Sequence, residues 1–190
     1  MNTEEIFKKS GAILEGHFLL TSGLHSPIYW EKFRVLQFPA YTRQLCHLIS
    51  DHFKKEKVDV VAGPTTGGII LAYEVAGQLG GVRGIFAEKV NTDHRVFKRG
   101  FGINPGDRVL IVDDILTTGK SIREVLSLIE EQGGEAIGIG VLVDRSEKKH
   151  DFSVPLFSCL RSITPAYEPQ ECPLCAAGTP LTKPGGSQSL

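Results

Sequence analysis

The chain has 190 residues, of which 41% are apolar, and its formal net charge is −1 at pH 7. This length and composition predict one domain with a buried core and room for a small appendage. The near-neutral charge argues against a surface for polyanions, no apolar run approaches the roughly 18 residues of a membrane span, and Met1–Ser10 lacks the apolar centre of a signal peptide. Four cysteines are too few for a disulfide scaffold of this size, so we expect a cytoplasmic protein with reduced thiols.

The first part of the chain predicts two helices with a hairpin between them. Residues 3–14 have the pattern of a short helix, and residues 41–55 place apolar side chains at helical spacing. Residues 16–30 are irregular, with turn signals at 22–23 and 26–27. We therefore expect this intervening segment to be hairpin-like.

The chain then alternates between short apolar strands and helices. Strands are predicted at 58–62, 83–87, 108–112 and 136–143, and helices at 69–79 and 119–132. Such alternation is typical of an α/β fold with a central parallel sheet that helices cover on both faces. The pattern becomes irregular beyond Asp144, and the Gly-, Pro- and Ser-rich residues 178–190 predict a frayed tail.

Polar or glycine-rich residues follow all four predicted strands. In an open α/β sheet, ligands bind outside the carboxyl ends of the strands. Those ends carry residues 63–68, Glu88-Lys89, Asp113-Asp114 and Asp144-Arg145. Because the ends of parallel strands lie at one edge of the sheet, these four junctions predict one ligand site there.

The most informative stretch is Val109–Ile122, with the sequence V-L-I-V-D-D-I-L-T-T-G-K-S-I. A buried strand places Asp113 and Asp114 at the sheet edge, and Thr117–Ser121 forms a turn at the N-terminus of a helix. Backbone N–H groups and the positive end of a helix hold phosphate, while carboxylates suit sugar hydroxyls or a hydrated metal ion. The stretch therefore predicts a site for a phosphorylated sugar.

Other interpretations of this stretch are weaker. An isolated Asp-Asp pair often caps a turn, but the T-T-G-K-S continuation disfavours that here. A Walker loop needs a glycine where Asp114 stands, so we do not expect an ordinary ATPase.

The loop Gly63–Gly68, with the sequence G-P-T-T-G-G, lets backbone N–H groups approach a ligand closely. By itself it could be a plain tight turn between a strand and a helix. Beside a second phosphate loop, it suggests a ligand with two phosphate groups far apart.

Residues 88–101 interrupt the alternation with a polar, charged segment that predicts a lid. Its cations, which suit closure over an anion, are Lys89, His94, Arg95, Lys98 and Arg99. The alternative is a solvated hairpin. After the last predicted strand, Arg145 could hold a carboxylate or a planar imide with paired hydrogen bonds, although a surface ion pair is the alternative.

Cys172 and Cys175 form a C-x-x-C pair. A zinc site usually needs two more ligands, and a second C-x-x-C is missing. Pairing across a dimer, with Cys159 or with a histidine would supply them, and otherwise the pair is structural and reduced. We expect His17 and His25 to have a structural role or to position residues of the ligand site without contacting the ligand themselves.

Together these motifs resemble those of the type I phosphoribosyltransferases, in which a stretch similar to Val109–Ile122 binds phosphoribosyl pyrophosphate. The supporting segments are G-H-F-L-L-T-S-G-L-H-S-P-I-Y-W at 16–30, A-G-P-T-T-G-G at 62–68, F-A-E-K at 86–89 and V-D-R-S at 143–146. The first segment and Asp144-Arg145 resemble the members that act on orotate, and the C-P-L-C sequence resembles the bacterial subgroup found in Thermus.

The resemblance implies a type I phosphoribosyltransferase fold, in which a central parallel sheet flanked by helices carries a small N-terminal hood. The segments it implies are a helix and hood at 1–40, a phosphoribosyltransferase core at 41–146, a C-terminal strand and hood region with the C-x-x-C pair at 147–177, and a flexible tail at 178–190.

The implied reaction moves the phosphoribosyl group of phosphoribosyl pyrophosphate to orotate, giving orotidine 5′-monophosphate and pyrophosphate, in a homodimer with Mg²⁺ as cofactor. A purine or xanthine phosphoribosyltransferase, or a non-catalytic sensor of phosphoribosyl pyrophosphate, would use the same phosphate loops. The sequence shows no DNA-binding module, so we expect small-molecule substrates as partners and neither nucleic acid nor membrane.

The resemblance also implies roles for individual residues. The catalytic residues would be Asp113, Asp114, Lys89 and His94. The substrate-binding residues would be Thr66, Gly67 and Lys89 at the pyrophosphate, Asp113 and Asp114 at the ribose, Thr117, Thr118, Gly119, Lys120 and Ser121 at the 5-phosphate, and Arg145, Ser22, His25, Tyr29 and Trp30 at the base. No direct metal ligand is expected, because the substrate would hold most of the Mg²⁺ shell, with Asp113 and Asp114 in contact through water.

The chain departs from the family pattern at three positions. Many members carry lysine where this chain has Thr21, Gly67 and Thr92, whereas the lid histidine of the family matches His94. The cations that could replace the missing lysines are Arg95, Lys98 and Arg99.

Overall fold

The computed structural model describes residues 1–20, 22–91, 94–146 and 148–184. The chain forms two compact units. The larger comprises Leu36–Ser162, and the smaller combines Met1–Val35 with Ile163–Leu190. Among the helices that the structure describes, none is long and apolar enough to cross a membrane.

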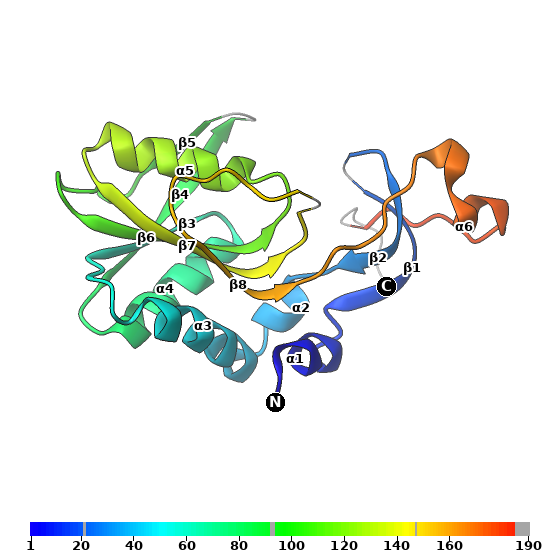
Figure 1. The fold of residues 1–190 in the computed structure, drawn as a ribbon, viewed down its shortest axis with the longest axis horizontal. Coiled ribbons are helices and arrows are strands. Elements are labelled where there is room, and N and C mark those ends of the chain that lie inside the picture. The colour runs from blue at the N-terminus through cyan, green and yellow to red at the C-terminus, as the bar shows by residue number, and fades with distance from the viewer. Residues whose placement is uncertain (21, 92–93, 147, 185–190) are drawn as a thin grey trace. The chain divides into compact units, whose positions relative to one another are not determined.

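The larger unit is built on a six-stranded sheet with the strand order β5-β4-β3-β6-β7-β8 (Figure 1). The strands are β3 (Val60–Pro64), β4 (Arg83–Asn91), β5 (His94–Phe97), β6 (Arg108–Leu116), β7 (Glu135–Asp144) and β8 (Leu156–Arg161). Neighbouring strands are parallel except for β4 and β5, which form an antiparallel pair at one edge. The parallel strands therefore bring their carboxyl ends to one edge of the sheet.

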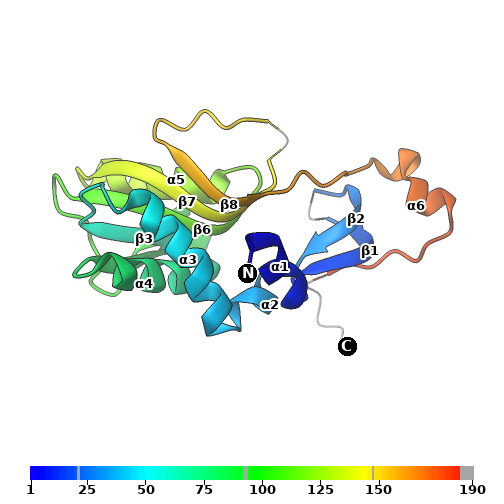
Figure 2. The same cartoon turned by 60° about the horizontal axis from the view of Figure 1, so that its bottom comes forward.

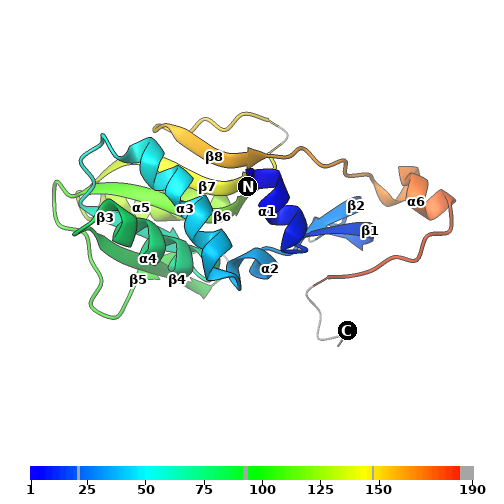
Figure 3. The same ribbon diagram turned by 90° about the horizontal axis from the view of Figure 1, so that it is seen from below.

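Helices cover both faces of this sheet (Figures 1 and 3). Helices α3 (Pro39–Phe53) and α4 (Gly67–Leu79) pack on one face, and α5 (Lys120–Glu131) packs on the other. The short helix α2 (Phe33–Leu36) precedes α3. Apolar side chains at helical spacing on α5, among them Ile122, Val125 and Ile129, are fully buried against the sheet. Each contributes roughly 1.5–3 kcal/mol by leaving water, so this packing fixes the position of the helix N-terminus.

The smaller unit contains a helix, a hairpin and an extended C-terminal segment (Figure 2). Helix α1 (Thr3–Lys9) precedes the antiparallel strands β1 (Ile13–Leu19) and β2 (His25–Trp30). The C-terminal segment carries η1 (Pro169–Glu171) and α6 (Pro173–Ala176). Asn2 caps α1, since its Oδ1 accepts a hydrogen bond from the Glu5 N–H at 2.8 Å.

The expected α/β fold with a central, mostly parallel sheet is confirmed. The predicted helix at 3–14 is too long, because Gly11 adopts φ +67° and the chain enters β1 two residues later. The predicted lid contains the antiparallel hairpin β4–β5, which was the alternative interpretation. The strand expected within 147–177 is β8, although its residues alone did not give its bounds, because its side chains are only partly buried. In the predicted tail, Thr182 forms a bridge to Phe18, and residues 185–190 lie outside the described part of the chain.

Candidate active site

Two carboxylates stand near the carboxyl end of β6, at the centre of the sheet. Asp113 is 6% exposed and Asp114 is 2% exposed. The Oδ1 of Asp113 accepts a hydrogen bond from the Asp114 N–H at 2.8 Å, and the Oδ1 of Asp114 accepts one from the Ile115 N–H at 2.7 Å. Because backbone donors hold both carboxyl groups, these side chains are fixed before any ligand binds.

The predicted 5-phosphate loop, Thr117–Ser121, joins β6 to α5. Gly119 precedes the first residue of α5 with φ +75°, a left-handed conformation that glycine adopts without strain. The Ser121 hydroxyl donates to Asp113 Oδ2 at 2.8 Å. The loop and the acids are therefore one hydrogen-bonded unit, and the first N–H groups of α5 face outward from the helix end as donors for an anion.

The second predicted loop, Gly63–Gly68, lies against Asp114. A Cβ atom on Gly67 would lie 1.7 Å from Asp114 Oδ2, and one on Gly63 would lie 2.4 Å from the Gly68 carbonyl oxygen. Within this loop the peptide bond between Thr65 and Thr66 is cis. The glycines thus allow close approaches that a side chain would block, and a lysine at position 67 would require Asp114 to move.

Arg95 joins the hairpin β4–β5 to the loop Gly63–Gly68 and to helix α5. Its Nε lies 2.8 Å from Oε2 of Glu124 on α5, and its Nη1 donates to Thr65 Oγ1 at 3.2 Å. Both members of this ion pair are largely buried. Arg95 therefore positions the hairpin, and its charge is already engaged by Glu124.

The remaining cations of the hairpin differ in their surroundings. Arg99 forms an ion pair with Glu88 at 2.7 Å. Lys89, His94 and Lys98 are exposed to solvent. Thr21 and Thr92, where many relatives carry lysine, lie outside the described residues.

The end of β7 adds the last predicted junction of the larger unit. Asp144 is buried and accepts hydrogen bonds from the Ser146 N–H, at 2.9 Å, and from the Ser146 hydroxyl. The Arg145 N–H donates to the Leu116 carbonyl at 2.8 Å. This bond places the Arg145 backbone beside Leu116 at the end of β6, directly before the predicted 5-phosphate loop.

Sequence reasoning missed two side chains that hold the carbonyl groups of the 5-phosphate loop. His150 Nε2 lies 3.0 Å from the Thr117 carbonyl oxygen, and Arg123 Nη1 donates to the Thr118 carbonyl at 2.8 Å. The periodicity of α5 predicts Arg123 only as a helix residue, and His150 lies in an irregular segment without any motif. His150 and Arg123 position the loop through contacts with its carbonyl groups, and the sequence pattern does not indicate these contacts.

The predicted base-binding residues of the smaller unit have different surroundings. Ser22 is exposed, and the Tyr29 ring lies 5.7 Å from that of Phe18. Trp30 is buried in the core, with its ring 5.2 Å from Phe7 in an edge-on contact. His25 is also buried, and its ring faces His17 and the cysteines of the C-x-x-C pair.

Two predicted phosphate loops beside buried carboxylates are the arrangement expected of a protein that binds phosphorylated sugars, and comparison with known families agrees. Residues 34–171 match the phosphoribosyl transferase domain family. The chain therefore belongs to the phosphoribosyltransferase family, as its motifs predicted.

Its relatives within that family are orotate phosphoribosyltransferases. The one from Caldanaerobacter subterraneus subsp. tengcongensis is 49% identical over 181 residues, covering 95% of this chain and 94% of that protein. The one from Thermus thermophilus is 42% identical over 181 residues, covering 95% and 98%. The crystal structure of orotate phosphoribosyltransferase from Aeropyrum pernix matches with a TM-score of 0.72 and 27% identity, over 83% of this chain and 92% of that one. The chain is thus an enzyme of this group, and the resemblance to the Thermus subgroup is confirmed.

Proposed function

We propose that the protein transfers the phosphoribosyl group of phosphoribosyl pyrophosphate to orotate. The bond between orotate N1 and ribose C1 forms, the bond between C1 and pyrophosphate breaks, and the products are orotidine 5′-monophosphate and pyrophosphate. The observation that carries this proposal is the close approach of Gly67, in one predicted phosphate loop, to Asp114, whose neighbour Asp113 is hydrogen-bonded to Ser121 of the other loop. This arrangement provides neighbouring sites for the two phosphate ends of one substrate, with carboxylates for the sugar between them.

On this proposal the loop Thr117–Ser121 binds the 5-phosphate through backbone N–H groups and the N-terminus of α5. The Ser121 hydroxyl already donates to Asp113, so Ser121 contributes its N–H to the phosphate. Asp113 and Asp114 accept hydrogen bonds from the ribose hydroxyls. Holding the sugar at both ends orients C1 toward the base, which supplies catalysis by positioning.

The pyrophosphate end is bound by the backbone at Thr66 and Gly67 and by exposed cations of the hairpin. Lys89 and His94 are the predicted cations, and both are exposed on β4 and β5. Negative charge builds up on the departing pyrophosphate while the ribose gains oxocarbenium character. Cations placed at the leaving group stabilise that transition state without any covalent intermediate.

The acid pair also fits the expected Mg²⁺. Mg²⁺ prefers oxygen ligands and usually keeps several waters when it binds substrate phosphates, and two carboxylates stand together at the junction of the phosphate loops. When bound, the ion would neutralise the pyrophosphate and help it to leave. Asp113 and Asp114 would hold it through water, beside the oxygen atoms of the substrate.

For the base, Arg145 is the proposed partner of the orotate carboxylate. A guanidinium group holds a carboxylate with two parallel hydrogen bonds. The roles of Ser22, His25, Tyr29 and Trp30 in base recognition remain predictions from the resemblance.

Pyrophosphate release, measured with orotate, uracil, adenine, hypoxanthine and xanthine offered separately, tests the proposed reaction. We expect release with orotate. We expect Arg145→Ala to lower that activity at least tenfold, because it removes a charge-assisted contact of about 1.5–3 kcal/mol. Arg43→Ala, on the exposed surface of α3, is the matched control. Turnover of a purine in preference to orotate, or full activity of Arg145→Ala, would contradict the proposal.

We also propose that the enzyme is a homodimer. Helix α4 exposes two large side chains, Tyr73 at 81% and Ile70 at 40%, and apolar groups exposed on one helix are typical of a surface that a partner covers. Light scattering should show a dimer, and Tyr73→Asp should shift it toward the monomer. A wild-type monomer with full activity would refute this arrangement.

A further inference from the structure

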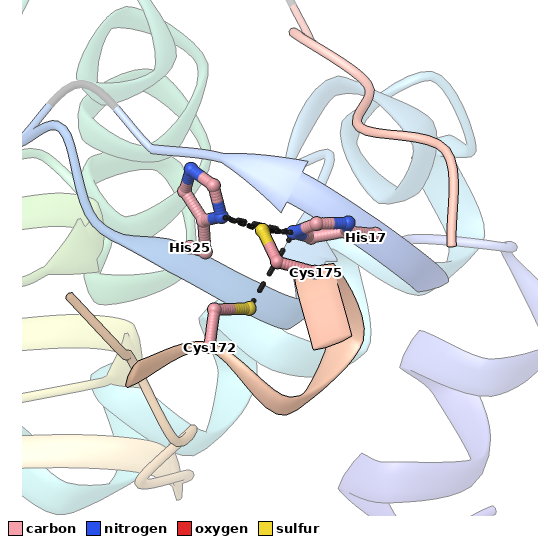
Figure 4. A group of neighbouring side chains, drawn as sticks. All are labelled: His17, His25, Cys172 and Cys175. Carbon is pink, nitrogen blue, oxygen red and sulfur yellow. Dashed lines mark hydrogen bonds between the residues drawn. The ribbon is translucent and has the colours of Figure 1, made fainter. Parts of the chain in front are cut away.

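Four metal-binding side chains meet in the smaller unit, far from the acids of the proposed reaction in sequence. Figure 4 shows His17 from β1, His25 from β2, and Cys172 and Cys175 from the segment that begins α6, with their side chains directed toward one another. One ligand atom from each residue lies within 4.8 Å of the other three. Both cysteines are free thiols.

Four of the six separations between these atoms are close to the edges of a zinc tetrahedron. Zn–S bonds of about 2.3 Å and Zn–N bonds of about 2.0–2.1 Å give edges of roughly 3.3–3.8 Å. His17 Nε2 lies 3.5 Å from Cys172 Sγ and 3.8 Å from Cys175 Sγ. His25 Nδ1 lies 3.3 Å from Cys175 Sγ and 2.9 Å from His17 Nε2. Binding would move the two ring nitrogens apart by a few tenths of an ångström, and the two remaining separations, which are within 4.8 Å, would adjust to the same edges.

A carbonyl group behind His17 sets its ring for metal binding. His17 Nδ1 lies 2.7 Å from the Thr179 carbonyl oxygen, which can only accept a hydrogen bond. The Nδ1 atom therefore carries the proton, and the Nε2 lone pair faces the two thiols. A hydrogen bond from the second ring nitrogen to a carbonyl is the usual support of a metal-bound histidine.

Backbone hydrogen bonds hold the two ligand-bearing segments together. Tyr167 and His25 exchange N–H···O bonds of 2.9 and 2.8 Å, just before the C-x-x-C pair. After that pair, the Thr182 N–H donates to the His17 carbonyl at 2.8 Å, and the Thr182 carbonyl accepts from Leu19 at 2.9 Å. The C-terminal segment is thus attached to the hairpin on both sides of the cysteines, so the four ligands are already close together.

The burial and chemistry of the cluster favour a structural metal. His17, His25 and Cys172 are 2%, 5% and 3% exposed. The apolar core of this unit is small, and its buried members among the described residues are Ile6, Phe7, Ala12, Phe18, Trp30, Val35 and Cys172. A unit of roughly 60 residues is often too small for a sufficient core, and a metal ion commonly supplies the missing stability.

We propose that His17 Nε2, His25 Nδ1, Cys172 Sγ and Cys175 Sγ bind one structural Zn²⁺ ion. Thiolate and imidazole ligands suit zinc, whereas Mg²⁺ takes oxygen ligands, so this site is separate from the magnesium chemistry of the larger unit. Four protein ligands leave no open position for catalysis. The ion joins the hairpin β1–β2 to the C-terminal segment.

Metal analysis of the full-length enzyme, purified without chelators, tests the proposal directly. We expect one zinc ion per chain, and we expect Co²⁺ in its place to give thiolate-to-cobalt charge-transfer bands and the visible bands of tetrahedral cobalt. Cys172→Ser and Cys175→Ser should lose the metal and the charge-transfer intensity. Cys159→Ser, which changes a cysteine outside the cluster, should keep both.

Thiol alkylation at pH 8 of the wild-type protein provides a test that needs no variant to fold. Burial raises the pKa of the Cys159 thiol to about 12 and also raises the pKa of Cys46, so neither should react quickly. We expect two additional fast-reacting thiols after chelation and their protection when Zn²⁺ is restored. Wild-type protein that binds neither Zn²⁺ nor Co²⁺, or thiols that react equally with and without Zn²⁺, would overturn the proposal. These readouts do not use the transferase reaction, so failure of the zinc site and failure of the proposed function are distinguishable.

Discussion

The two units of the molecule hold their functional side chains in different ways. In the larger unit, the strand before Asp113 is fully buried at Leu110, Ile111 and Val112, and the acids at its end accept hydrogen bonds from the backbone. In the smaller unit, His17, His25 and Cys172 are buried beside the exposed Cys175, and few apolar side chains are buried among its described residues. The proposed phosphate site is thus held by the fold itself, whereas the hairpin of the smaller unit depends on the metal ion that we propose for its cluster.

Removal of the proposed zinc should therefore destabilise the smaller unit and leave the larger unit folded. This is the largest effect we expect. Structural zinc supplies about 10 kcal/mol or more of apparent folding free energy in small domains. In hydrogen exchange, chelation should remove the protection of β1, β2 and the segment around α6, while β6 and α5 keep theirs. Zn²⁺ should restore the protection and Mg²⁺ should not. Retained protection of β1 and β2 in the metal-free protein would show that the hairpin does not need the ion.

The buried ion pair between Arg95 and Glu124 should give the next largest effect, within the larger unit. Arg95→Met leaves a largely buried carboxylate without its partner, and such a loss costs about 3–5 kcal/mol of unfolding free energy. Urea unfolding measures this cost. The matched control is Arg99→Met on the same hairpin, whose partly exposed pair with Glu88 should contribute only about 0.2–1 kcal/mol.

A double variant sharpens this test. Arg95→Met combined with Glu124→Leu removes both charges, so much of the lost stability should return. Equal destabilisation by Arg95→Met and Arg99→Met would mean that the hairpin is not anchored through the buried pair.

Local patterns were sufficient to predict most of the larger unit. Val109–Ile122 contains a strand, its terminal acids, a phosphate loop and the start of a helix in one continuous stretch, so each part limits the interpretation of the next. The periodicity of α5 and the alternation of strands and helices predicted the layers in the same way. These features depend on contacts between residues that are close in sequence.

The missed features depend on contacts between distant residues. His17 and Cys172 are 155 positions apart, and His150 reaches the loop carbonyl of a residue 33 positions earlier. The C-x-x-C pair indicated a metal site with two ligands unknown, and several partners were equally consistent with the sequence. Only the pairing of β1 with β2 and their bonds to the C-terminal segment select the two histidines.

The smallest of the three effects is expected at the acids of β6, where the fold should remain intact. Asp113→Asn and Asp114→Asn remove a negative charge while keeping the size of the side chain and one oxygen acceptor. Each should weaken Mg²⁺-dependent binding of phosphoribosyl pyrophosphate by about 1.5–3 kcal/mol, the range for a hydrogen bond to a charged group. Calorimetric titration measures this loss of affinity. An unchanged free energy of unfolding in urea would show that the fold does not depend on the charge at these positions.

Asp59→Asn is the matched control for these variants. Its carboxylate also accepts a backbone hydrogen bond, from the Arg108 N–H at 3.0 Å, but it does so at the beginning of β6, the opposite end of the strand. An aspartate that merely supports the sheet should therefore leave the affinity for phosphoribosyl pyrophosphate unchanged. Wild-type affinity in both Asp113→Asn and Asp114→Asn would remove the acids from the site. If Asp59→Asn lost a comparable affinity, the effect of Asp113→Asn and Asp114→Asn would come from a disturbed sheet, because only the carboxyl end of the strand carries the proposed phosphate loop.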